Sequence, residues 1–262
     1  MRAIIAIGRT TLGEAIRRKV LLVILLVGVL FLSVAPGLGV LSARSETVVL
    51  RGMVLGIIQL TSALIAIVLT VYMLPNEIER RTIYTILCKP VQRWQFLIGK
   101  YLGAVLALGV MMLLMTTVME ITVAINQGID ANRMVELATG PLMFFIQMSL
   151  LAAVAMFFST FVTPLVNFFL SAGMYLLGSL FATFFETLKD NPNTHPLPKA
   201  VALVVNTILP NFSNYNVQNH LINPDQTIQN PTAYYTFVTG YGLFYIGVLL
   251  VGAILIFDRR EF

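Results

Sequence analysis

Charged residues, cysteine and histidine, which supply most catalytic and metal-binding groups, are scarce in this chain of 262 amino acids. Charged residues make up 11 % of the sequence, less than half the share usual in soluble domains, and hydrophobic residues make up 58 %. The single cysteine, Cys88, excludes an intrachain disulfide and a thiolate metal cluster. Two histidines, His195 and His220, leave little material for metal binding or acid–base chemistry. The composition therefore indicates an integral membrane protein.

Motifs for catalysis and nucleotide binding are also missing from the sequence. It contains no G-x-x-x-x-G-K-[ST] loop, which excludes ATP binding in the usual P-loop manner. It contains neither the H-E-x-x-H zinc motif nor the G-x-S-x-G nucleophile motif, so an intramembrane hydrolase is not supported. The net charge of +5 is not a nucleic-acid signal, because basic residues in membrane proteins mainly set topology. We expect no enzymatic activity, no cofactor and no metal on this chain.

Long apolar runs predict an all-α integral membrane protein with one domain, residues 1–262, and six transmembrane helices. Each run is long enough to cross a hydrocarbon core of ~30 Å at ~1.5 Å per residue. Residues 141–188 are too long for one span, and Pro164, which lacks a helix donor, places the break near 159–164. The expected spans are about 20–41, 53–74, 97–125, 141–161, 165–188 and 234–257.

Residues 1–19 combine arginines with apolar residues at helical spacing, among them Ile5, Leu12 and Ile16. This pattern predicts an amphipathic helix on the membrane surface ahead of the first span. An ordinary positively charged flank explains the same residues equally well.

Basic residues are distributed unevenly between the two sides of the membrane. With six spans, the N-terminal flank, the loop 75–96 with the start of the next span, and the C-terminal tail all lie on one side of the membrane. Together these segments contain twelve Lys and Arg residues. The opposite side carries five. Because positive residues accumulate on the cytoplasmic side, we expect both termini and the loop 75–96 in the cytoplasm. The loop 189–233 is then extracytoplasmic, and its length is typical of functional loops.

The segment 76–100 concentrates seven of the 29 charged residues, 17 basic plus 12 acidic, in a chain that is otherwise mostly apolar. Asn76 followed by Glu79 predicts a helix start, and Pro90 predicts its end. Ile83 and Leu87 lie on the apolar side of this predicted helix of residues 77–87. A second helix is expected to begin at Arg93 and to continue into the third span. A helix that contacts a partner is favoured, although a solvated loop is the simpler alternative.

Here the sequence resembles a known family. The run ERRTIYTILCKPVQR at residues 79–93 and LIGK at residues 97–100 resemble the cytoplasmic loop after the second span of type-2 ABC transporter permeases. RTTLGEAIRRK at residues 9–19 and FDRREF at residues 257–262 resemble the ends of that family, especially the branch near the permease of nitrous-oxide-reductase maturation. Arg81 departs from the pattern, because many members carry Gly there.

The resemblance implies that residues 75–96 form a coupling helix, which binds in a groove of a separate ATPase subunit and transmits its movement. The residues that match the pattern are Glu77, Glu79, Thr82, Leu87, Pro90 and Arg93. Ile83 and Leu87 are expected to supply buried contact, and Arg80, Arg81 and Arg93 to face acidic residues of the partner.

The family further implies a dimer with a second permease copy or a paralogue, surrounded by lipids in a bacterial or archaeal inner membrane. ATP and Mg²⁺ would bind the partner ATPase. The expected function is ATP-driven export of a hydrophobic or amphipathic substrate, such as a lipid, a drug or a peptide-like molecule.

Two alternatives remain open. In a mechanotransmission complex, ATP hydrolysis would remodel an extracytoplasmic protein through the loop 189–233. In a proton- or ion-coupled transporter, Glu120 would be the functional residue, because it is the one ionisable residue well inside a predicted span. Glu120 lies six residues from Asn126, so it could equally reach the outer interface.

Overall fold

The computed structural model describes residues 2–39, 46–79, 92–128, 131–190, 210–216 and 230–259, and every regular element in these ranges is a helix. The expected all-α fold is therefore confirmed. The elements are α1 (Arg2–Ile16), α2 (Lys19–Gly39), α3 (Glu46–Val71), α4 (Met73–Glu79), α6 (Arg93–Gln127), α7 (Ala131–Ser159), α8 (Pro164–Asp190), the 3₁₀ helix η1 (Phe212–Tyr215) and α11 (Pro231–Asp258).

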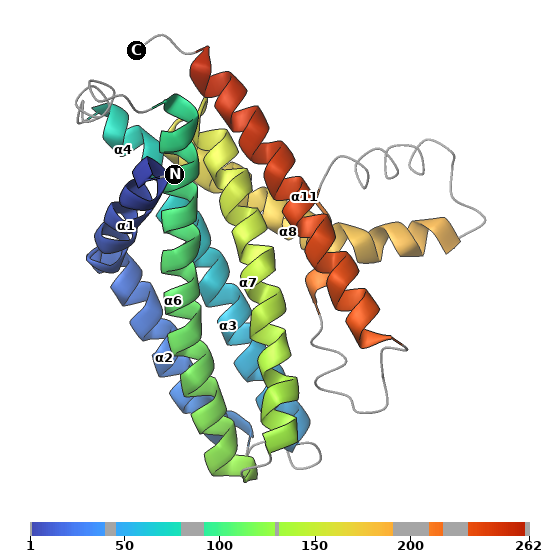
Figure 1. Cartoon of the computed structure of the whole chain (residues 1–262). Coiled ribbons are helices and arrows are strands. Elements are labelled where there is room, and N and C mark those ends of the chain that lie inside the picture. The colour runs from blue at the N-terminus through green and yellow to red at the C-terminus, as the bar shows by residue number, and fades with distance from the viewer. Residues whose placement is uncertain are drawn as a thin grey trace.

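Five of the described helices, α2, α3, α6, α7 and α11, are long and apolar enough to cross a membrane. α3 and α7 lie at the centre of the bundle, α2 packs on α3 and α6, and α11 packs on α7 (Figure 1). α1, α4, the start of α6 and the end of α11 lie at the same end of the bundle, which we call the α4 end (Figure 1). The start of α1 and the end of α11 thus share one end, as six crossings require.

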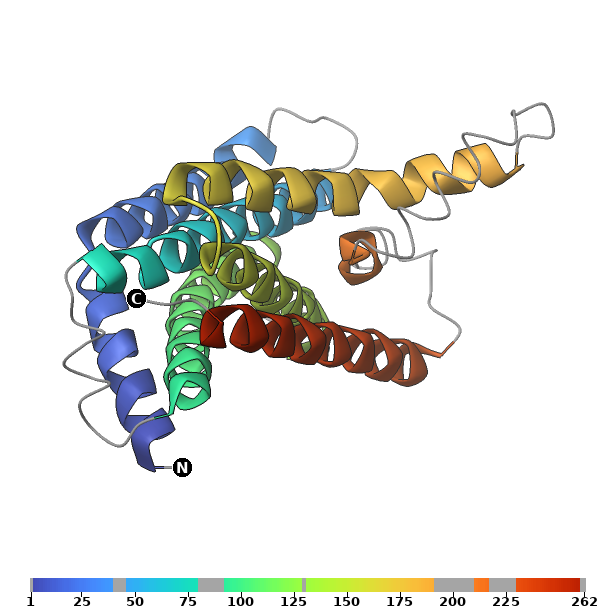
Figure 2. The same ribbon diagram turned by 90° about the horizontal axis from the view of Figure 1, so that it is seen from above.

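α8 occupies the position of the expected fifth span but differs from the other five helices. Its apolar described part, Pro164–Leu180, is shorter than the other candidate spans. α8 also runs at a steep angle to α7 and α11 (Figure 1), and the view from above separates it from α11 (Figure 2). A total of six transmembrane helices therefore remains a prediction.

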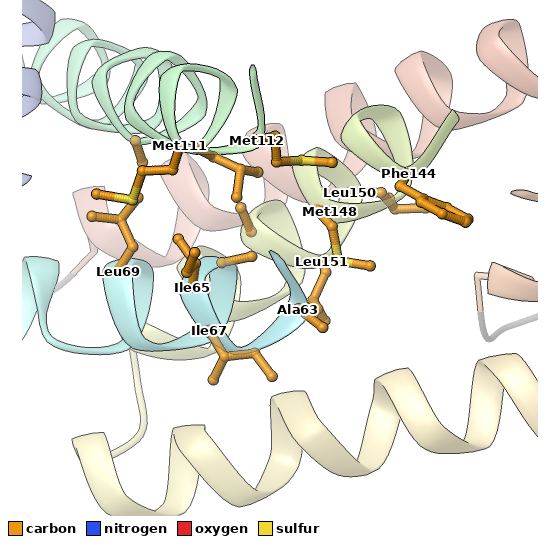
Figure 3. Close-up of a cluster of buried hydrophobic side chains, with 14 of the residues drawn as sticks. Ala63, Ile65, Ile67, Leu69, Met111, Met112, Phe144, Met148, Leu150 and Leu151 are labelled. Carbon is orange, nitrogen blue, oxygen red and sulfur yellow. The ribbon is translucent and has the colours of Figure 1, made fainter. Parts of the chain in front are cut away.

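The core of the bundle is formed where α3, α6 and α7 meet. Figure 3 shows Ile65 and Leu69 of α3 near Met111 of α6, with Met148 and Leu151 of α7 completing the cluster. All five of these side chains are buried. Lipid is as apolar as these residues, so close packing rather than water exclusion holds the helices together, and flexible methionines fill the gaps between them.

The predicted break between residues 159 and 164 is confirmed: α7 ends at Ser159 and α8 begins at Pro164. The Ser159 hydroxyl donates to the carbonyl of Met156 at 2.7 Å, and Thr160 does the same to Phe157. Both hydroxyls are thus hydrogen-bonded within the last turn of α7, where the backbone hydrogen bonds of the helix end. Pro164 can begin α8 because the first turn of a helix needs no amide donor.

The third and fourth expected spans leave residues 126–140 outside the helices, but most of this stretch is helical. α6 ends at Gln127, and Gly128 follows with a φ of 83°, a conformation that glycine adopts without strain. α7 then begins at Ala131, so the chain reverses within a few residues and Pro141 lies inside a helix. Polar composition alone misplaced the helix start, because the first turns of a long helix can extend beyond the hydrocarbon.

A short segment of the loop 189–233, residues 210–216, returns to the helices. η1 lies between α8 and α11 (Figure 2), and its side chains Phe212 and Tyr215 are fully buried. Gln147 of α7 donates to the carbonyl of Phe212 at 2.9 Å, and the Tyr215 hydroxyl donates to the carbonyl of Val238 of α11 at 3.2 Å. Burial raises the pKa of Tyr215, so its hydroxyl keeps the proton that it donates.

Two glycines make room for these aromatic side chains. A side chain at Gly178 of α8 would collide with Phe212, and one at Gly242 of α11 would collide with Tyr215. η1 is therefore fixed to α7, α8 and α11 together.

Candidate functional site

The α4 end of the bundle contains the described part of the predicted coupling segment. Glu77 and Arg93, the two predicted site residues with described side chains, flank residues 80–91 in the chain. Glu79 ends α4, and its side chain is not described. The predicted site residues outside the described ranges are Arg80, Arg81, Thr82, Ile83, Leu87 and Pro90.

The predicted helix start at Asn76 is wrong, whereas the predicted start at Arg93 is confirmed. α4 begins at Met73, so Asn76 lies inside a helix rather than at its N-cap. Pro75 is tolerated there because it falls in the first turn of α4. α6 begins at Arg93 after an extended Gln92, whose backbone amide donates to the Gln95 side chain at 3.4 Å.

Lys100 forms the centre of the charged cluster at this end. Only 3 % of the residue is exposed, one of the lowest values for a charged residue in the described ranges. Its Nζ atom lies 2.6 Å from Oε1 of Glu77 in α4 and 3.5 Å from Oε2 of Glu14 in α1. Burying an ammonium costs folding free energy unless a nearby carboxylate compensates its charge. These ion pairs therefore fix α4 to α6.

Arg93 has a partner within the chain. Its guanidinium donates to the carbonyls of Phe257 and Asp258 at 3.3 and 3.1 Å, at the end of α11. One turn further along α6, Phe96 stacks on Phe257 with ring centroids 6.4 Å apart. A cation at the C-terminal carbonyls of a helix is favourable, so Arg93 stabilises the end of α11. Its predicted contact with an ATPase remains a prediction.

The predicted N-terminal helix is present as α1, whereas its place on the membrane surface stays a prediction. α1 packs mainly on α6 through the small residues Gly8, Thr11 and Ala15, which are buried. Ile5 and Ile16, two of the apolar residues expected to face the membrane, are exposed by 69 % and 41 %. Gly103 of α6 lets the two helices approach, because a side chain there would meet α1 within 2.6 Å. Close backbone approach through small residues is a common form of helix packing in membranes.

Glu120 lies far from this cluster. It is 20 residues beyond Lys100 on α6, or about 30 Å along the helix, which is close to the thickness of the hydrocarbon core. Its side chain is half-buried and takes part in no ion pair among the described residues. This position favours the opposite membrane boundary over the middle of the span.

The residue pattern and the helical bundle agree with a family comparison. A family model described as "ABC-2 family transporter protein" matches residues 5–262, nearly the whole chain. The chain belongs to the ABC-2 transporter family. No curated protein matches it.

Membership of this family makes the chain a multi-pass permease, the membrane component of an ABC transporter, and implies association with an ABC ATPase subunit. The membrane component of this family is not itself catalytic, and the Lys100 cluster joins α6 to α1 and α4 through ion pairs. Local sequence patterns did not predict the Glu77–Lys100 and Glu14–Lys100 pairs. The signal available in the sequence was a lysine, Lys100, inside the G-x-x-x-G pair of Gly99 and Gly103.

Proposed function

We propose that this ABC-2 permease exports a hydrophobic or amphipathic molecule from the cytoplasm, driven by a separate ATPase that binds residues 75–96. The observation that carries the proposal is the buried Glu77–Lys100 pair, which joins α4 and α6, the two helices on either side of residues 80–91. A movement of the segment would therefore reach two helices of the bundle at once. ATP binding to the partner would move the segment and open a path for the substrate.

A cavity between α3 and α8 supports the proposed substrate class. It has a volume of about 320 Å³ and is lined by apolar residues such as Leu60, Leu64 and Leu176. Gln59 and Tyr175 are the polar side chains at its wall. Such a surface suits a molecule that is mostly apolar and carries one or two polar groups.

The remaining details extend the proposal to the assembly. Twelve basic residues on the side of the termini support a cytoplasmic α4 end, in a bacterial or archaeal inner membrane. α8 exposes a row of large apolar residues, including Leu165, Phe169 and Leu176, which a second permease copy or lipid would cover. The FDRREF end supports a place near the nitrous-oxide-reductase maturation branch.

The experiment is a detergent pull-down of the tagged chain from its native membrane, followed by mass spectrometry of the bound proteins. We expect an ABC ATPase with the wild-type chain and its loss with Leu87→Asp. Thr10→Asp places the same charge on the exposed side of α1 and should retain the ATPase. A chain that is isolated alone and stable would contradict the proposal.

A second candidate, mechanotransmission to an extracytoplasmic protein, is favoured by one observation. The described part of the outer loop, residues 210–216, is bonded to α7 and α11, so movement of these helices would displace it. Reconstituted vesicles separate the two functions. ATP-dependent transfer of a lipid-like probe supports export, whereas ATP turnover without transfer, together with an outer protein bound to the loop, supports mechanotransmission.

A further inference from the structure

Two carboxylates on different helices compete for one buried lysine at the α4 end. Lys100 is 3 % exposed and lies 2.6 Å from Glu77 and 3.5 Å from Glu14. The Glu77 side chain is 14 % exposed and the Glu14 side chain 54 %. Glu77 is therefore the main partner of Lys100 in this structure. The Glu14 carboxylate lies near the outer limit of distance for an ion pair and remains largely accessible to water.

The distance between Glu14 and Lys100 is set by tight backbone packing. Around Gly8, Gly99 and Gly103, α1 and α6 approach so closely that a side chain at Gly99 would meet the Ile4 carbonyl at 3.1 Å. Backbone atoms cannot yield as flexible side chains do, so α1 and α6 move as one unit. Glu14 therefore stays within reach of Lys100 whatever the other elements do.

The distance between Glu77 and Lys100 depends instead on the position of α4, which packs on α3 and α7. α4 has only seven residues and leads directly into residues 80–91, the segment proposed to bind the ATPase. Glu77 and Lys100 thus lie on the two helices that precede and follow this segment. If α4 moved away from α6, this ion pair would lengthen, and the buried ammonium would need another carboxylate as its main partner.

We propose that Glu14 is this replacement partner, and that Lys100 exchanges Glu77 for Glu14 when α4 moves. The exchange keeps the ammonium paired in both states, which lowers the barrier to separating α4 from α6. Glu14 is then a positioning residue that acts through Lys100. In its role during ATP turnover this inference rests on the proposed function, but the exchange itself does not require an ATPase.

The first test uses the permease alone in detergent and measures its melting temperature. Glu77→Gln and Glu14→Gln should each lower it only slightly, because each variant leaves Lys100 one carboxylate. The double variant should lower it by more than twice the sum of the two single shifts, because the ammonium then has no charged partner. Adding Lys100→Met to the double variant should restore most of the loss, because it removes the unpaired charge.

Additive shifts would overturn the proposal, because Glu14 would then not replace Glu77. Equal melting of the double and triple variants would overturn it as well, since the loss would not come from Lys100. Arg9→Gln, which neutralises an exposed residue of the same helix α1, is the matched control and should leave the melting temperature unchanged in every background.

The second test uses the permease with its co-purified ATPase. Glu14→Gln should retain the bound ATPase and melt only slightly below the wild type but lower ATP turnover about fivefold, because a purely structural pair would not affect the cycle. Wild-type turnover in Glu14→Gln would overturn the role in the cycle. If no ATPase co-purifies with the wild-type chain, the proposed function fails, while the melting test still decides the exchange.

Discussion

Gly103 of α6 lies directly beneath Thr11 of α1, so close that a Cβ atom on the glycine would come within 2.6 Å of the threonine Cβ. The Gly8 carbonyl lies equally near. Real Cβ atoms essentially never come this close to another non-bonded atom, so the crossing of α1 and α6 depends on glycine at this position. Gly99, one turn earlier on α6, lies similarly close to Ile7 of α1, so both glycines of this G-x-x-x-G pair face α1.

Gly103→Ala should therefore displace α1 from α6. Overpacking at a site that cannot relax costs about 1–3 kcal/mol of unfolding free energy. Thermal melting in detergent and hydrogen exchange of residues 2–16 measure the effect. Gly13→Ala is the control on α1, because nothing lies within 4 Å of its added methyl group, and it should leave stability unchanged or raise it slightly. Equal behaviour of the two variants would contradict the close crossing.

Arg93→Ala should loosen the end of α11. It removes the two hydrogen bonds to the Phe257 and Asp258 carbonyls, and loss of a charged donor costs about 1.5–3 kcal/mol. We expect faster amide exchange in residues 253–258 and a lower melting temperature. Arg9→Ala, at an exposed position, should have neither effect. Loss of the ATPase at unchanged stability would instead assign Arg93 to the partner interface.

Phe212→Ala should destabilise the bundle through η1. The Phe212 side chain is fully buried and packs beside Gly178 and Tyr175, and truncation of a buried phenylalanine costs about 3–5 kcal/mol. Phe237→Ala is the control, because that side chain is 72 % exposed and should melt like the wild type. Small, equal shifts in both variants would show that η1 does not stabilise the bundle.

Glu120→Gln should leave ATP-driven activity within about twofold of the wild type at pH 6, 7 and 8. The residue lies about 30 Å along α6 from Lys100, near a membrane boundary, where a neutral amide is tolerated. ATP turnover of the reconstituted complex at the three pH values is the measurement. A pH-dependent loss of activity would revive proton coupling through this residue.

The sequence alone determined the membrane class, the helical fold and the regions of the five candidate spans. These features follow from hydrophobic run length and from proline, which act locally and therefore can be read residue by residue. The start of α6 at Arg93 and the break before Pro164 were predictable for the same reason. The starts of α4 and α7 were not, because helices in a bundle can extend through polar residues that local rules assign to loops.

Only the tertiary structure decided which residues meet. Nothing local pairs Lys100 with Glu77 and Glu14, binds Arg93 to the end of α11, or inserts η1 between α8 and α11. These contacts join residues up to 165 positions apart, as in the bond from Arg93 to Asp258. Such contacts arise from the way helices cross, and the crossings depend on backbone approach at single glycines. Run lengths and charge counts carry no information about that geometry.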